Sequence, residues 1–170
     1  MEFNDVIRQR FSCRKFSEKQ VEKEKLNATL EAGRLAPTAK NFQEQHVYVI
    51  QSEEMIKKID MATRCRYGAP TVLVVTFNIN HVFVYPDKSK NSGAEDAAIV
   101  ATHMILAATN EGINSCWINI LDEKKLREVL NLPEEEEVLM IMDLGYKNEG
   151  IGPCRLHEDR KPLDETVSYM

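Results

Sequence analysis

Apolar residues recur along the chain at helical spacing in some stretches and in short continuous runs in others. Their spacing before Arg10 predicts a first short helix. Ser17 and Gln20 have the spacing of a capping box, which predicts the start of a second helix. We expect this second helix to stop at Ala36, because Pro37 disfavours helical geometry in the residue before it.

The rest of the chain alternates between short strands and helices. Runs rich in apolar and β-branched residues, bounded by turn formers, predict strands. Capping residues ahead of apolar periodicity predict helices beginning at Ser52 and at Asp122. The predicted strands are His46–Gln51, Thr71–Phe77, Ile113–Leu121 and Val138–Leu144. This order favours an α/β arrangement around one sheet, and we find no linker that would divide residues 1–170 into two domains.

The longest helical pattern runs from Gly93 to Glu111, and Gly112 is placed to end it. This stretch has apolar residues on more than one side, which predicts burial in the core or against a second subunit. We expect His103, on its apolar face, to be a core residue. The tail from Gly150 onward lacks periodicity and should need a surface to lie against.

Composition narrows the possible functions. The 170 residues carry a net charge of −5, which argues against a nucleic-acid partner. No apolar run reaches the roughly 20 residues of a membrane span. The N-terminus is polar and acidic, unlike a signal peptide. Four scattered cysteines without a CxxC pair favour free thiols and a cytoplasmic location.

A basic cluster near the N-terminus is the first candidate site. Arg10 and Arg14 flank Ser12, offering forked donors and a hydroxyl suited to a phosphate. A solvated helix end would explain the same charges. Neither a GxxxxGK[ST] nor a GxGxxG loop follows a strand, so side chains and helix termini would have to hold any phosphate.

The segment 36–43 is the second candidate. Its amide side chains carry donors and acceptors that could meet the mixed edge of a flavin ring, although such residues more often form a turn with backbone hydrogen bonds. The four histidines lack metal-ligand spacing, and no nucleophile motif is present. Trp117 fits either a core position or a place under a ring.

In combination, these segments resemble the nitroreductase family of FMN-dependent oxidoreductases. The resemblance covers nearly the whole chain, in seven blocks that keep the family's order. The matching residues are Arg10, Ser12, Arg14 and Phe16; Pro37, Asn41 and Gln43, with Thr38 for serine; Gly93 and Asp96; Gly112–Asp122; Leu132 and Pro133; Leu144–Tyr146; and Arg160–Leu163.

The resemblance implies an α+β, nitroreductase-like fold with a central, mostly antiparallel sheet flanked by helices. It also implies an intertwined homodimer in which residues 150–170 pack on the partner, with two FMN sites built from both subunits. Phosphate and ribityl contacts would come from Arg10, Phe11, Ser12, Arg14 and Arg160. Ring contacts would come from Pro37, Thr38, Ala39 and Asn41 of the other subunit, and from the backbone of Asn119 and Ile120.

The chain departs from the family around the ring. Ala62 and Cys65 stand where larger members have an asparagine and a lysine, and either Arg64 or Arg66 is a candidate for the missing charge. Asn119 replaces a glycine of many short members. The stretch between residues 78 and 91 is short, so we expect an open pocket.

The implied activity is electron transfer from NADH or NADPH through FMN to an electron-poor acceptor, such as a nitro compound or a quinone, by a ping-pong mechanism. No acid–base catalytic residue and no metal are expected. Two alternatives are another flavin reaction on the same fold, such as reductive dehalogenation or flavin fragmentation, and a non-enzymatic flavin-binding protein.

Overall fold

The computed structural model describes residues 1–170. Nine helices and strands form the body, and three single 3-10 turns lie outside them. The helices are α1 (Phe3–Gln9), α2 (Lys23–Arg34), α3 (Glu53–Asp60), α4 (Gly93–Asn110) and α5 (Glu123–Leu130). The strands are β1 (Gln45–Ile50), β2 (Thr71–Asn78), β3 (Asn114–Ile118) and β4 (Glu136–Gly145), and the 3-10 turns are Ala39–Asn41, Arg155–His157 and Leu163–Glu165.

The four strands form one sheet in the order β1-β2-β4-β3, and all three pairings are antiparallel. The chain is therefore α+β, as the family resemblance implies, and the α/β expectation from element order alone was wrong. Helices intervene between strands, yet each connection brings the chain back antiparallel. β2 lies inside the sheet and is buried from Thr71 to Phe77, which explains its continuous apolar run.

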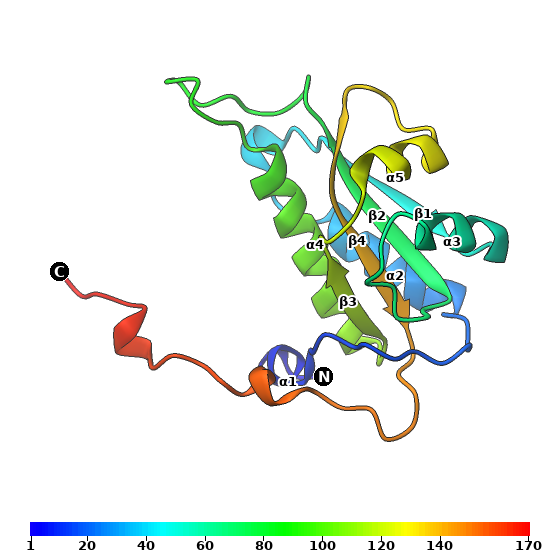
Figure 1. Cartoon of the computed structure of the whole chain (residues 1–170). Coiled ribbons are helices and arrows are strands. Elements are labelled where there is room, and N and C mark those ends of the chain that lie inside the picture. The colour runs from blue at the N-terminus through cyan, green and yellow to red at the C-terminus, as the bar shows by residue number, and fades with distance from the viewer.

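Helices cover both faces of the sheet (Figure 1). On one face, α2 and α4 enclose a core cluster of 17 buried residues that includes Leu73, Val100 and Met104. On the other face, α3 and α5 and the segment after α1 enclose a second cluster of 13 buried residues. β3 is an edge strand of this sandwich, and one of its long sides is therefore open to another segment.

Two of the predicted helix caps are confirmed. The Ser52 hydroxyl accepts a hydrogen bond from the Met55 amide at 3.3 Å, and the Asp122 carboxylate accepts one from the Lys125 amide at 3.1 Å. Each cap satisfies an amide that has no partner within its helix.

The predicted capping box of Ser17 and Gln20 is wrong, because α2 begins only at Lys23. The Gln20 side chain donates instead to the Pro70 carbonyl at 3.1 Å. The Ser17 amide donates to the Tyr146 carbonyl at 2.8 Å. The Gln20 side chain and the Ser17 amide, which a capping box would use, are thus engaged in long-range hydrogen bonds. At its other end α2 stops at Arg34, slightly before the expected Ala36.

The long helix α4 has nearly the predicted extent, and the core of the single chain covers only part of its surface. Its sheet-facing side is buried, whereas Ile99, Thr102 and His103 are exposed in the single chain. Burial of the remainder against a second subunit stays a prediction. The expectation that His103 is a core residue was wrong. Its Nδ1 lies 2.9 Å from the Ile99 carbonyl oxygen, on the open face of the helix.

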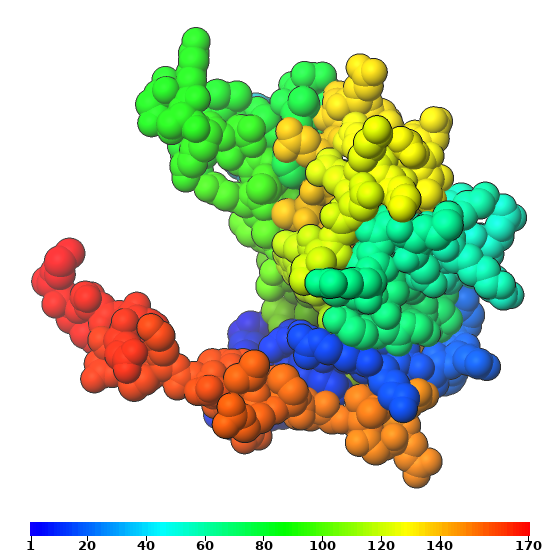
Figure 2. Space-filling view, in the orientation of Figure 1, coloured from blue at the N-terminus to red at the C-terminus, as the bar shows by residue number.

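The tail begins at residue 150, passes beside α1, and then runs away from the body to the C-terminus (Figure 1). The space-filling view shows the tail and the segment around residues 80–92 projecting from the same side, with a hollow between them (Figure 2). Apolar side chains of the tail are largely uncovered, among them Leu163 at 67% and Tyr169 at 90% exposure. No helix combines the length and the hydropathy that crossing a membrane requires.

Gly93, at the start of α4, tests the packing of the helix on the sheet. A Cβ at this position would lie 2.3 Å from a ring carbon of Phe77. We predict that Gly93→Ala lowers the free energy of unfolding by about 1–3 kcal/mol in chemical denaturation, because the core must move apart to admit the methyl group.

The matched control is Gly152→Ala in the tail, where an added Cβ meets no atom within 4 Å. This variant should stay within about 0.5 kcal/mol of the parent protein. Equal effects of the two substitutions would contradict the close packing at Gly93.

Candidate cofactor site

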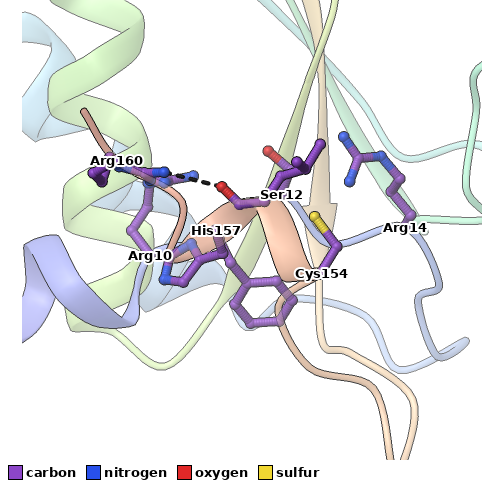
Figure 3. Close-up of a pocket in the computed structure, with 8 residues that line it drawn as sticks. Arg10, Ser12, Arg14, Cys154, His157 and Arg160 are labelled. Atoms are coloured by element: carbon purple, nitrogen blue, oxygen red, sulfur yellow. Dashed lines mark hydrogen bonds between the residues drawn. The ribbon is translucent and has the colours of Figure 1, made fainter.

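A pocket rich in positive charge lies where the segment after α1 meets the tail (Figure 3). Its cavity measures about 190 Å³. The pocket brings together all of the residues that the resemblance assigns to the phosphate and ribityl, although Arg160 is far from the others in the sequence. The lining residues are Arg10, Phe11, Ser12, Arg14, Cys154, Leu156, His157 and Arg160.

Backbone contacts place these residues. After α1, the chain runs along the open edge of β3, and the Cys13 amide donates to the Ser115 carbonyl at 2.9 Å. The tail returns to α1, where Nε2 of His157 lies 2.9 Å from the Arg8 carbonyl oxygen. The basic pocket therefore forms between the segment that pairs with β3 and the part of the tail that contacts α1.

The donor set of the pocket suits a phosphate. Arg10 and Arg160 lie together on one side, and Ser12 and Cys154 lie between them and Arg14 (Figure 3). Arg160 is held by its own turn, because it donates to the Leu156 carbonyl at 3.0 Å. Guanidinium forks and a hydroxyl offer several charge-assisted hydrogen bonds to an anion.

A second cavity, of about 380 Å³, lies beyond the far end of β3. Ile120 lines it and follows Ser115 by five residues, a reach of up to about 17 Å along an extended chain. β3 therefore lies between the basic pocket and the larger second cavity. The second cavity is lined by Asp60, Met61, Ala62, Thr63, Arg64, Ile120, Leu121 and Asp122.

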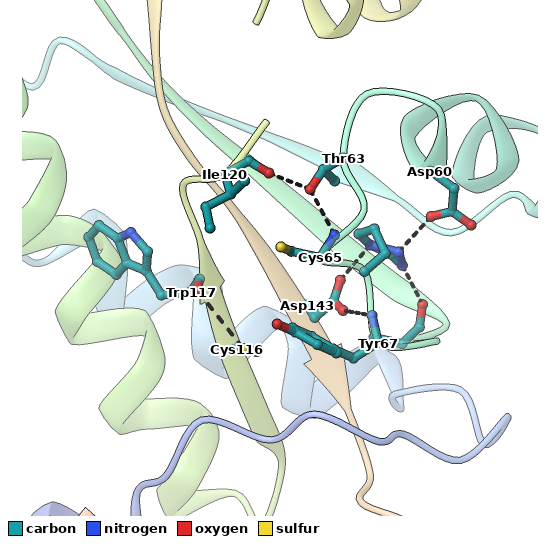
Figure 4. Close-up of polar contacts among 10 residues, drawn as sticks. Asp60, Thr63, Cys65, Tyr67, Cys116, Trp117, Ile120 and Asp143 are labelled. Atoms are coloured by element: carbon teal, nitrogen blue, oxygen red, sulfur yellow. Dashed lines mark hydrogen bonds and ion pairs between the residues drawn. The ribbon is translucent and has the colours of Figure 1, made fainter. Parts of the chain in front are cut away.

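A hydrogen-bond network fixes the loop on one side of the second cavity (Figure 4). The Thr63 hydroxyl donates to the Ile120 carbonyl and accepts from the Cys65 amide at 3.0 Å. Further along the loop, the Tyr67 amide donates to the Asp143 carboxylate at 2.9 Å. The loop is therefore tied to β4 and to the end of β3 at once.

Arg66 and Asp143 form a buried ion pair at the base of this loop. The Arg66 Nε lies 2.6 Å from Asp143 Oδ1, and the side chains are 5% and 0% exposed. Arg66 also pairs with Asp60 at 3.0 Å. Burial raises the pKa of Asp143 to about 6, and the positive charge of Arg66 acts against that rise.

This pairing distinguishes the two arginines proposed for the ring. Arg66 is fully engaged inside the protein and does not line the second cavity. Arg64 is exposed and lines that cavity beside Ile120. Arg64 is therefore the arginine available to a group bound there.

Asn119 and Trp117 are linked to each other. The Trp117 indole N–H donates to the Asn119 side-chain oxygen at 2.5 Å. Trp117 packs, partly buried, against the core cluster between the sheet and α4. The side chain of Asn119 is thus engaged with Trp117.

The predicted ring contacts from residues 37–41 lie elsewhere in the single chain. The Ala39 amide donates to Asp96 in the first turn of α4 at 3.0 Å, whereas Leu106, toward the other end of α4, lines a cavity with Arg10 and Arg160. The residues of α4 from Asp96 to Leu106 rise about 15 Å. One chain therefore does not bring Pro37, Thr38, Ala39 and Asn41 to the basic pocket.

Comparison with known proteins identifies the family. The sequence model of the Nitroreductase family matches residues 7–67 and 65–146. The chain belongs to the nitroreductase family. A solved nitroreductase family protein from Clostridium difficile 630 is 36% identical, with 99% of this chain and 98% of that chain covered and a TM-score of 0.92.

Two further members of the family extend the comparison. A solved protein from Clostridium difficile R20291, described as an FMN-dependent nitroreductase, is 28% identical with a TM-score of 0.77, and the match covers 96% of each chain. An Archaeoglobus fulgidus protein with the provisional name NADH dehydrogenase/NAD(P)H nitroreductase is 29% identical, over 91% of this chain and 96% of its own length.

Several residues of the site escaped the sequence analysis. Cys154 and His157 line the basic pocket, but nothing in their spacing ties them to Arg10. Thr63 and Asp143 act through contacts between distant segments. The one available signal was Asp143 within the apolar run Val138–Leu144, because a buried carboxylate needs a charged or hydrogen-bonding partner.

The buried ion pair leads to a prediction about pH. A raised pKa means that the contribution of Asp143 to stability is lost as pH rises through about 6. Arg66→Met removes the opposing charge and raises this pKa further. We predict a loss of about 3–5 kcal/mol in the free energy of unfolding at pH 8 and a smaller loss at pH 5, where Asp143 is protonated.

Arg64→Met is the matched control, because this neighbouring arginine is exposed. Urea denaturation of the cofactor-free protein should show a change within about 0.5 kcal/mol at both pH values. An Arg66→Met loss that is independent of pH would contradict the assigned role of Asp143.

Proposed function

We propose that this protein is an FMN-dependent oxidoreductase that passes electrons from NADH or NADPH to an electron-poor acceptor. The observation that carries the proposal is the basic pocket of Arg10, Ser12, Arg14 and Arg160, with a second cavity beyond the end of β3. The description of the Clostridium difficile R20291 relative supports FMN, and the name of the Archaeoglobus relative supports NAD(P)H.

The residues fit FMN in their chemistry. The arginines and Ser12 would hold its phosphate, and the backbone at Asn119 and Ile120 would border its ring. Bound FMN supplies the ability to accept a hydride and to release electrons. Arg64 would stabilise negative charge at the edge of the ring, because a fixed cation needs no reorganisation during the reaction.

Ping-pong kinetics follow from this arrangement, in which the nicotinamide leaves before the acceptor enters the same open cavity. The acceptor class that we propose is a nitro compound or a quinone. The role of the protein is to position the ring and to keep one of its faces accessible.

We further propose that the working form is a homodimer. The basic pocket and residues 37–41 lie near opposite ends of α4. A second subunit can therefore supply its own residues 37–41 to the site that contains the basic pocket of the first. The exposed face of α4 and the uncovered tail give the dimer its surfaces (Figure 2). Residues 150–170 would pack on the partner.

The cofactor assignment predicts a yellow protein that releases FMN on denaturation. Arg10→Ala should weaken FMN binding by roughly ten- to a hundred-fold, because each charge-assisted hydrogen bond contributes about 1.5–3 kcal/mol. Fluorescence titration measures the affinity. Riboflavin, which lacks the phosphate, should bind the variant and the parent protein equally.

Arg8→Ala is the control for charge alone, since Arg8 is exposed and does not line the basic pocket. It should change FMN affinity by less than about three-fold. Equal losses of FMN and riboflavin in Arg10→Ala would contradict the phosphate role. NADH or NADPH should bleach the flavin anaerobically, and a quinone should restore its colour.

The dimer predicts that Ile99→Arg, on the open face of α4, yields a monomer with little bound FMN, because a charge would be buried in the interface. Lys124→Glu, exposed on α5 across the sheet, should leave the dimer intact. Sedimentation velocity measures both. A parent protein that sediments as a folded monomer with bound FMN would contradict the proposal.

A further inference from the structure

Two carboxylates are buried together at the beginning of α4. Glu44, just before β1, is 6% exposed, and Asp96 in the first turn of the helix is 5% exposed. Each has one oxygen, Oε2 of Glu44 and Oδ2 of Asp96, that is buried without a hydrogen-bond partner. Buried polar atoms in folded proteins nearly always have a partner, so this pair requires an explanation.

The other carboxylate oxygens are occupied. Asp96 Oδ1 accepts from the Ala39 amide at 3.0 Å, and Glu44 Oε1 accepts from the Ser92 hydroxyl at 3.4 Å. Ser92 brings the two residues together, because its carbonyl also accepts from the Asp96 amide at 2.8 Å. Ionised carboxylates only accept hydrogen bonds, so two neighbouring ones cannot satisfy each other. A proton between them supplies the missing donor. Burial and the neighbouring Asp96 both raise the pKa of Glu44.

No nearby cation donates a hydrogen bond to the two carboxylates. Lys40 lies over the Phe83 ring, 4.8 Å from its centroid. Lys90 pairs with Glu95 at 2.9 Å, and Tyr85 donates to the same glutamate at 2.7 Å.

On the sheet side, His46 and Tyr48 both contact Glu136, at 2.9 Å each. These charged and titratable groups are therefore engaged with one another and make no hydrogen bond to Glu44 or Asp96. No charged group other than the two carboxylates themselves is therefore available to Glu44 and Asp96.

The segment that the pair holds is under strain. Lys40, Asn41 and Gln43 have φ values of 52°, 58° and 53°, in the left-handed region that residues other than glycine rarely adopt. The Ala39 amide is tied to Asp96, and Glu44 follows Gln43 directly in the chain. Such a conformation persists only when its surroundings fix it.

We propose that Glu44 and Asp96 share one proton and thereby hold residues 38–43 in the conformation that serves the cofactor site of the partner subunit. Both are positioning residues. The role in the cofactor site rests on the proposed function, whereas the shared proton and its hold on the loop can be tested without flavin.

Infrared difference spectroscopy of the cofactor-free protein at pH 7 tests the shared proton. The parent protein should show the band of a protonated carboxyl group, and Glu44→Gln and Asp96→Asn should each lack it, because an amide then donates to the remaining carboxylate. Asp143 cancels in the difference spectrum. Absence of the band from the parent protein, or its retention in Glu44→Gln, would overturn the proposal, as would a bound cation at the pair.

Hydrogen exchange tests the hold on the loop. Above the pKa of the pair, protection of the Ala39 and Gln43 amides should fall about tenfold per pH unit in the parent protein, after correction for intrinsic exchange. Glu44→Gln should remove this dependence and keep the protection, whereas Glu44→Ala should lose protection at every pH. The exposed Glu134→Gln should behave like the parent protein, and a pH-independent parent protein would overturn the proposal.

Flavin titration above pH 7 tests the link to the site. FMN affinity should fall with pH in the parent protein and stay level in Glu44→Gln. Level affinity in both proteins would overturn the positioning role. A protein that binds no FMN at any pH would instead refute the proposed function, and the spectroscopic and exchange results would still decide the shared proton.

Discussion

The open edge of β3 is the feature on which the rest of the site depends. An edge strand presents unpaired backbone groups, and the segment after α1 uses them through the bond from Cys13 to Ser115. This contact places Ser12 and Arg14 beside the sheet and directs the chain toward β4. The chain leaves β3 after Ile118, and Ile120 then lines the second cavity beyond the end of the strand.

Burial also lowers the reactivity of the two cysteine thiols at the contact between β3 and the segment after α1. Cys13, in the added segment, and Cys116, in β3, are both buried in the core, and burial raises the pKa of Cys116 to about 11. The pKa of Cys13 is raised for the same reason. Both thiols therefore stay protonated near neutral pH, which suits a site whose chemistry belongs to a bound cofactor.

Local sequence signals predicted much of the fold. The caps at Ser52 and Asp122 and the buried run of β2 are properties of short segments, and each was confirmed. The Ser17–Gln20 box failed because Gln20 bonds to the distant Pro70, a competition that no local pattern records. Strand direction likewise depends on connections in space and came only from the family resemblance.

The residues of the candidate site likewise fall into those that a local pattern could predict and those that depend on distant contacts. Arg10, Ser12 and Arg14 lie in one short segment, and their joint position could be anticipated. The choice of Arg64 over Arg66 could not, because it depends on the buried partner Asp143. The buried pair of Glu44 and Asp96 has no sequence signal either, since the two residues are far apart in the chain and only the fold brings these carboxylates together.

Subunit complementation tests the central claim, a cofactor site shared between two chains, most directly. Arg10→Ala/Arg160→Ala and Pro37→Glu should each give homodimers without FMN. In a mixed dimer purified with two different tags, one site carries both defects and the other carries none. The account predicts one FMN per mixed dimer, measured by flavin absorbance after denaturation. A mixed dimer as empty as its parents would contradict the shared site.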